Sequence, residues 1–183
     1  MKALVHTLIA ATAMGLCACT GTSGGGGADG GSAKVNFDAT ALSNNIADNV
    51  ITADYVARDA AAANLVTATT ALRTGGATEA ELDDAQLKWK ATRVPWESSE
   101  GFLFGPVDAE GIDPLIDTWP LAISDLQNFL AAGNTSTDSV RGASENVQGF
   151  HTLEYLLFGD GVADNDQSAT DLSTQDRDYL VSC

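Results

Sequence analysis

The amino-acid sequence predicts an all-α helical bundle. Apolar residues recur at three- and four-residue steps over long stretches, which is the spacing of one face of a helix. No stretch of any length alternates apolar and polar residues in the way of a half-buried strand. The chain has 183 residues, of which 44% are hydrophobic, enough for one packed core and too many for a disordered chain.

The first expected element is one long helix, straight or bent, over residues 37–73. This stretch is rich in alanine and contains neither proline nor glycine. Apolar residues lie on one face of it at Leu42, Ile46, Val50, Ala53, Ala57, Leu65, Ala68 and Leu72. Gly75 and Gly76 are expected to end the helix, because glycine is favoured just past a helix C-terminus.

A second helix is expected after Thr78, since Thr78 followed by Glu81 is the pattern of a capping box. One face carries Leu82, Ala85, Trp89 and Thr92. Pro95 lacks a backbone N–H, so it should kink or interrupt the helix near Val94. The helix is expected to resume over 96–104 and to stop at Gly105-Pro106.

Helix breakers divide the rest of the chain. Residues 107–119 contain Gly111 and Pro114 among acidic residues, and we expect an irregular loop there. Further helices are expected over 121–130, from Thr137 or Ser139 to Gly159, and from Thr174 onward, with a polar loop over 161–173. The last helix has about two turns before the chain stops, so we expect the domain to be incomplete at its C-terminus.

The acidic composition excludes several partners. Nine Lys and Arg stand against 25 Asp and Glu, which makes the formal net charge −16. Nucleic acids and anionic lipid surfaces are bound through clustered Lys and Arg. We therefore expect no nucleic-acid partner and no basic membrane-docking patch, and an acidic surface attracts cations.

The N-terminal sequence predicts a targeting segment. Met1-Lys2 is followed by an apolar run, Leu4 to Leu16, that is too short to cross a bilayer and predicts a secretory signal. The following Cys17-Ala18-Cys19 completes a sequence that resembles the lipobox of bacterial lipoproteins, which is cut before the last cysteine. We expect a lipoprotein signal peptide over 1–18 and a lipid on Cys19.

The expected mature protein is a tethered domain with little cysteine or histidine chemistry. Residues 19–35 form a Gly/Ser-rich flexible tether, and the helical domain covers 36–183. Thr20 is not Asp, so the inner-membrane retention signal is absent, which favours the outer membrane facing the periplasm. Without the signal peptide, His151 is the single histidine and no disulfide framework is possible. An ordinary signal peptide is the alternative.

Two short clusters could carry chemistry, one over 93–106 and the other over 149–159. His151 and Glu154 are three residues apart, so they share one face of a helix, and Glu97 and Glu100 have the same spacing. Two helices that each present such a pair can converge on one metal ion. Three carboxylates and one imidazole suit Fe, Mn or Zn.

Each pattern also has an ordinary interpretation. A single His-x-x-Glu in a helix is more often a pair that supports the core, and Glu97 with Glu100 is more often a solvated face. Arg93 has the spacing to pair with Glu97, four residues on. The three tryptophans, Trp89, Trp96 and Trp119, are expected in the core.

Several motifs together carry a family resemblance. The run from Gly149 to Gly159 resembles the GxHxxE signature of the imelysin family. The segment from Trp89 through Arg93, Glu97 and Glu100 to Asp108 is similar to a second recurrent segment of that family. Asp117-Thr118-Trp119-Pro120 resembles its Trp-Pro element. The resemblance covers about residues 36–183, with the motifs in the expected order.

The resemblance implies a fold, a location and a site. Imelysin-like proteins are bacterial periplasmic or outer-membrane proteins, often iron-regulated lipoproteins, with two bundle-like helical halves. This chain would supply the first half. The resemblance implies that His151 and Glu154 ligate a metal, Fe or Zn, with Glu97 or Glu100 completing the site. Arg93 would lie outside the ligands and orient them or a substrate.

Several functions remain open at this point. We favour a lipid-anchored, metal-binding envelope protein in iron acquisition or handling, with an envelope iron-uptake protein as partner. An imelysin-type metallopeptidase is the alternative, although the chain lacks the His-Glu-x-x-His pattern of many helical zinc peptidases. A non-catalytic helical binding module, or a nonfunctional fragment of a longer gene, is the third.

Overall fold

The computed structural model describes residues 37–160 and 167–183, and the regular elements in these ranges are helices. The all-α prediction is therefore confirmed. Apart from 37–39, the described residues belong to one compact unit, Thr40–Cys183. The predicted signal peptide, the tether and Cys19 lie outside the described residues. No helix in the described ranges is long and apolar enough to cross a membrane.

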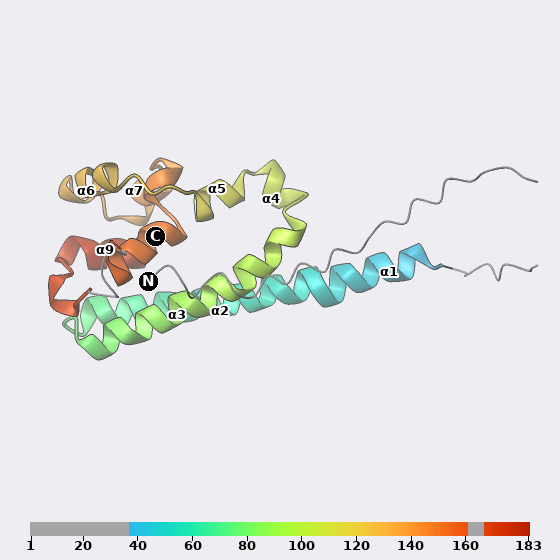
Figure 1. Ribbon diagram of the computed structural model, residues 1–183, viewed down its shortest axis with the longest axis horizontal. Helices are drawn as coiled ribbons and strands as arrows, with labels where there is room; N and C mark the ends of the chain where they lie inside the picture. The colour runs from blue at the N-terminus through green and yellow to red at the C-terminus, as the bar shows by residue number, and fades with distance from the viewer. Residues whose placement is uncertain (1–36, 161–166) are drawn as a thin grey trace, which may run out of the picture. The chain divides into compact units, whose positions relative to one another are not determined.

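A long helical hairpin forms one side of the unit. Helix α1 (Ala39–Ile46) continues through a π-helical turn (Ala47–Ile51) into α2 (Thr52–Thr74), which confirms the predicted long helix. After Gly75-Gly76 the chain reverses, and α3 (Glu79–Ser99) runs back beside α2 (Figure 1).

The reversal is fixed by the predicted capping box. The Glu81 N–H donates to the Thr78 hydroxyl at 3.3 Å, and the Thr78 N–H donates to the Glu81 carboxylate at 2.8 Å. The two side chains thereby each accept a backbone N–H at the start of the helix, where such donors lack the usual partner one turn earlier.

Pro95 does not interrupt α3, so this part of the sequence-based expectation is wrong. The helix continues to Ser99 and ends in a 3₁₀ turn (Glu100–Phe102). A proline in a helix leaves the carbonyl four residues earlier without its usual donor. That carbonyl belongs to Ala91, which is solvent-exposed, so water can replace the missing donor.

Four short helices form a second layer. They are α4 (Pro106–Ala109), α5 (Ile112–Asp117), α6 (Ile123–Ala131) and α7 (Thr137–Arg141). The expected loop over 107–119 is therefore wrong, whereas the helix expected over 121–130 is confirmed. Pro114 is compatible with α5 because it is the third residue, where a helical N–H has no partner within the helix.

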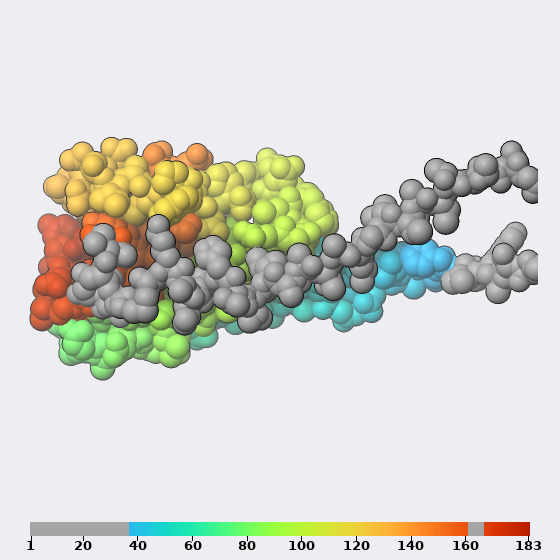
Figure 2. All heavy atoms as spheres, in the orientation of Figure 1, coloured from blue at the N-terminus to red at the C-terminus, as the bar shows by residue number. Residues whose placement is uncertain are grey.

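The C-terminal helices lie between the hairpin and this second layer (Figure 1). The single helix expected from Thr137 to Gly159 is wrong, because it is divided into α7, a 3₁₀ turn (Glu145–Val147) and α8 (Phe150–Phe158). After a 3₁₀ turn (Ala169–Asp171), α9 (Thr174–Ser182) begins where it was predicted. In Figure 2 the yellow atoms of the α6 region lie along the upper edge, above the orange and red C-terminal helices.

The core joins all three layers and holds α8 in place. Its fully buried large side chains include Trp96, Tyr179, Leu72, Leu82, Leu126 and Leu157. Side chains of α3 form hydrogen bonds with both ends of α8. Trp89 Nε1 donates to the Phe150 carbonyl at 3.1 Å, and Gln86 Nε2 donates to the Leu157 carbonyl at 2.7 Å. The Tyr179 hydroxyl of α9 donates to the Val147 carbonyl just before α8.

Candidate functional site

One carboxylate, that of Asp117 at the end of α5, connects three helices. Its Oδ1 lies 2.5 Å from Arg93 Nη1 of α3 and 3.1 Å from His151 Nε2 of α8. Its Oδ2 accepts a hydrogen bond of 2.7 Å from Trp96 Nε1. The side chain is only 11% exposed. Asp117 therefore makes three charge-assisted contacts in a largely desolvated position, where such contacts are strong.

The imidazole of His151 is held between two carboxylates. Nε2 faces Asp117, and Nδ1 lies 3.0 Å from Glu154 Oε2, one turn along α8. An ionised carboxylate accepts hydrogen bonds but cannot donate them. Both contacts are therefore hydrogen bonds only when the ring carries a proton on each nitrogen, and a neutral ring leaves one nitrogen lone pair directed at an acid.

Arg93 lies between the carboxylates of Asp117 and Glu97 and contacts both. Its guanidinium contacts Asp117 through Nη1 and Glu97 through Nη2, and it lies 4.9 Å from the ring centroid of Phe150. The side chain of Glu97 is 47% exposed, while that of Arg93 is 20% exposed. The predicted pairing of Arg93 with Glu97 is confirmed, and the arginine also fixes the orientation of Asp117.

Negative charge is in excess at this site. Four carboxylates, those of Glu97, Glu100, Asp117 and Glu154, are accompanied by the fixed positive charge of Arg93 and by His151. Desolvation raises the pKa of Glu100, and the carboxylates of Glu97, Asp117 and Asp113 raise it further against the lowering effect of Arg93. Such a site favours a cation.

Trp119 borders the cluster on its solvent side. Its ring lies edge-on to the His151 ring with 4.8 Å between centroids, and 71% of its surface is exposed. It precedes Pro120 through a cis peptide bond. Trp89 and Trp96 are buried as expected, but the expectation that Trp119 belongs to the core is wrong, because it lies at the surface beside the His151 ring.

Gly149 allows α8 to approach α5 closely enough to build the cluster. Its backbone angles, φ 84° and ψ −162°, lie in a region that only glycine occupies readily. A Cβ atom at this position would lie 2.2 Å from the carbonyl oxygen of Ile116, the residue before Asp117. The first glycine of the Gly-x-His-x-x-Glu pattern is therefore required by a backbone contact that brings His151 to Asp117.

The fold brings most of the sequence-predicted site residues together. His151 joins Glu154 directly, and it joins Arg93 and Glu97 through Asp117. The Glu100 carboxylate is coupled to them electrostatically, but it forms no hydrogen bond with another described residue. Within residues 37–160 and 167–183, no group of three or more His, Cys, Asp and Glu side chains is placed to hold one metal ion together. Metal binding by these residues stays a prediction.

Sequence reasoning missed Asp117 as a site residue. Asp117 enters the sequence analysis only as part of the Trp-Pro element, because a loop is expected over 107–119. One signal was available, since Asp117 stands two residues before the Trp119-Pro120 pair in a segment that resembles a family motif. The position of its carboxylate between α3 and α8 depends on tertiary packing, which local spacing does not encode.

Comparisons with known proteins agree on one family. The family model described as Imelysin matches residues 51–183. Iron-regulated protein A of Synechococcus elongatus is 34% identical over 134 residues, which are 73% of this chain and 33% of that protein. The chain thus spans about a third of the length of the curated relative that it matches.

A solved structure shows a further similarity. It is a crystal structure from Parabacteroides distasonis described as an iron-regulated protein A precursor. The two chains are 30% identical, the match covers 67% of this chain and 36% of the other, and the TM-score is 0.48.

The contact between Gly149 and Ile116 leads to a first prediction. Gly149→Ala should lower the free energy of unfolding by at least about 1–3 kcal/mol, the cost of the backbone conformation alone. It should also shift the His151 ring resonances in NMR spectra, because α8 must move away from Asp117. Gly101→Ala is the matched control, since a Cβ there meets nothing within 4 Å. Equal effects of the two substitutions in urea denaturation would contradict this account.

The raised pKa of Glu100 leads to a second prediction. Because its pKa is higher in the folded than in the unfolded chain, ionised Glu100 opposes folding above both values, and this opposition disappears as the pH falls through the folded value. Glu100→Gln should therefore raise the melting temperature at about pH 7 but not at about pH 3. Glu110→Gln, at an exposed acid outside the cluster, is the control. A gain that is the same at both pH values would refute the electrostatic cause.

Proposed function

The chain belongs to the imelysin family, and from this we propose that it is an iron-related protein of the bacterial cell envelope. Its acid and histidine cluster, which consists of Arg93, Glu97, Glu100, Asp117, His151 and Glu154, would bind a metal ion, iron or zinc. The name of its relative, iron-regulated protein A, supports the connection with iron. The excess of carboxylates around His151 supports a cation as the ligand.

The pair formed by His151 and Asp117 is the observation that carries the proposal. An imidazole nitrogen and a carboxylate oxygen are common ligands of iron and zinc. Metal bonds to such atoms are about 2.0–2.2 Å long, so two neighbouring ligands of one ion lie roughly 3 Å apart. His151 Nε2 and Asp117 Oδ1 are 3.1 Å apart. The donor chemistry of this pair fits the ion.

The remaining ligands are the acids named from the sequence. Glu154 contacts the other ring nitrogen, Glu97 is paired with Arg93, and the carboxylate of Glu100 accepts no hydrogen bond from a described residue. Since no three described ligands already converge, metal binding requires one of these acids to leave its present position. It also competes with Arg93 for Asp117. A bound ion would neutralise carboxylates that now repel one another.

The envelope location in this proposal depends on Cys19. A lipid on this residue, followed by the Gly/Ser-rich tether, would hold the helical domain at the outer membrane on the periplasmic side. There the domain could exchange metal with an envelope iron-uptake protein, the partner that we propose.

Metal titration tests the proposed site. Anaerobic calorimetry with Fe²⁺, and separately with Zn²⁺, should show saturable binding of one ion per chain. His151→Ala and Asp117→Asn should each weaken it at least about tenfold, in line with the loss of a ligand or of its supporting group. Glu145→Gln, which removes an exposed acid outside the cluster, should leave binding unchanged. Absence of saturable binding, or full binding by His151→Ala, would remove the metal function.

Lipid labelling tests the proposed anchor. In a bacterial host supplied with radiolabelled palmitate, the chain should become labelled and sediment with membranes. Cys19→Ala should abolish both results, because the acylated residue is gone. Cys17→Ala should change neither, because it leaves the acylated cysteine in place. Label that persists in Cys19→Ala would contradict lipidation at this position.

A further inference from the structure

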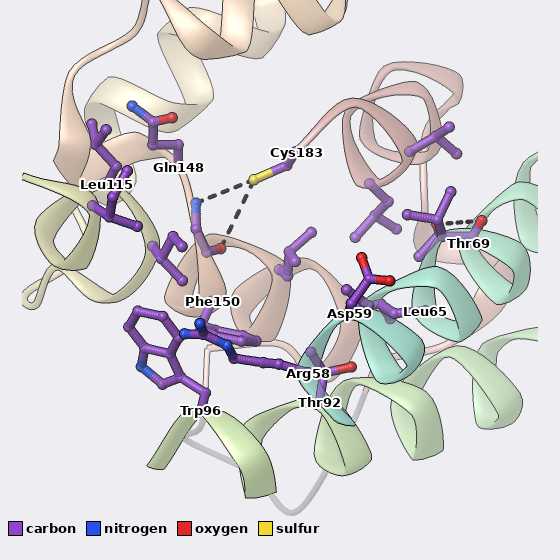
Figure 3. Close-up of a pocket in the computed structure, with 18 of the residues that line it drawn as sticks. Arg58, Asp59, Leu65, Thr69, Thr92, Trp96, Leu115, Gln148, Phe150 and Cys183 are labelled. Atoms are coloured by element: carbon purple, nitrogen blue, oxygen red, sulfur yellow. Dashed lines mark hydrogen bonds between the residues drawn. The ribbon is translucent and has the colours of Figure 1, made fainter. Parts of the chain in front are cut away.

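A cavity lies beside the acid and histidine cluster, on the other side of Trp96 and Phe150. It has a volume of about 450 Å³ and is lined by residues of α2, α3, α5, α8 and α9 (Figure 3). This volume is within the usual range of small-molecule sites. Most of the wall is apolar, with contributions from Leu65, Val66, Leu115, Ile116, Leu153 and Val181.

Arg58 of α2 places a cation in this wall. Its guanidinium lies 4.3 Å from the ring centroid of Tyr55 and 5.2 Å from that of Trp96, and Nη1 donates to Ser99 Oγ at 3.4 Å. Figure 3 shows the side chain extending across the floor of the cavity toward Trp96. The two rings hold the guanidinium in one position, and the long contact with Ser99 leaves most of its donors available.

Three other polar side chains of the wall are already hydrogen-bonded to backbone carbonyls nearby. The hydroxyl of Thr69 donates to the Val66 carbonyl at 3.2 Å, and that of Thr92 to the Lys88 carbonyl at 2.9 Å. Gln148 Nε2 donates to the Ala143 carbonyl at 3.0 Å. Arg58 is therefore the strongest donor that this cavity offers to a ligand.

No described carboxylate forms an ion pair with Arg58. Asp54 lies one turn earlier on α2 and Asp59 directly follows, yet neither lies within 4.0 Å of the guanidinium. Figure 3 shows the Asp59 carboxylate directed away from it. Arg58 is partly buried beside apolar walls, and an anionic ligand would supply the counter-ion that it lacks among the described residues.

We propose that this cavity binds a medium-chain fatty acid, with its carboxylate on Arg58 and its hydrocarbon chain along α2. At 1.5 Å per residue, α2 rises roughly 10–12 Å from Arg58 to Leu65 and Val66, which suits an extended chain of roughly eight to ten carbons. The bidentate geometry of guanidinium matches a carboxylate, and the apolar wall matches the chain. Because the net charge of −16 disfavours anions in general, binding depends on this one arginine.

Calorimetry with decanoate tests the proposal. The full chain is purified without detergent and titrated below the micelle concentration, with a chelator present so that metal at the other cluster plays no part. Decanoate should bind saturably, and decanol, which has the same chain without the charge, should bind at least about tenfold more weakly. Arg58→Gln should lower the affinity for decanoate at least about tenfold and leave the affinity for decanol unchanged. Arg58→Lys should keep part of the affinity for decanoate.

Two further variants make the test specific to this cavity. Arg141→Gln removes an exposed arginine outside the cavity and should leave decanoate affinity unchanged. Val66→Glu places a carboxylate at an exposed position of the wall, where the fold tolerates it. It should lower the affinity for decanoate, because a charged group then lies beside the hydrocarbon chain of the ligand. Three outcomes would overturn the proposal: no binding of decanoate, equal affinity of Arg58→Gln and the wild type for decanoate, or affinity for decanoate no higher than for decanol.

Discussion

The structure of the cluster depends on the carboxylate of Asp117 more than on any other group. It accepts from Arg93 and Trp96 of α3 and contacts His151 of α8, so one side chain at the end of α5 ties together elements from all three layers. Its small exposure makes each contact stronger than it would be in water, and it also makes an unpaired carboxylate costly there. The position of His151 is therefore set by α5 as much as by its own helix.

Backbone packing supports the same arrangement from a second direction. Gly149 lets the start of α8 lie against the Ile116 carbonyl, while Trp89 and Gln86 of α3 bond the carbonyls at the two ends of α8. Helix α8 is thus restrained at its ends by hydrogen bonds and at its start by a close contact. Rigid support of this kind is what a site needs when it must keep like charges together.

The sequence predicts the local structure well and the site only in part. The capping box at Thr78, the end of α2 and the start of α9 follow from short-range chemistry, and they are confirmed. The loop expected over 107–119 is instead partly helical, because Pro114 stands in the first turn of α5 and proline breaks a helix only beyond that turn. The stretch 137–159 looks like one helix in the sequence because Val147, Phe150 and Leu157 keep a helical spacing across the break before α8. All three side chains are buried in the same core. Asp117 could be placed only by packing.

Two tilted aromatic rings, each contacted by one arginine, lie between the acidic cluster and the cavity. Trp96 and Phe150 lie 5.7 Å apart, Arg58 lies over the first ring and Arg93 over the second. The two cations have similar aromatic partners but different neighbours, because Arg93 meets two carboxylates and Arg58 meets none among the described residues. Residue type alone therefore does not decide what either arginine can bind. The charges around each do, and they make one side of the aromatic pair suitable for a cation and the other for an anion.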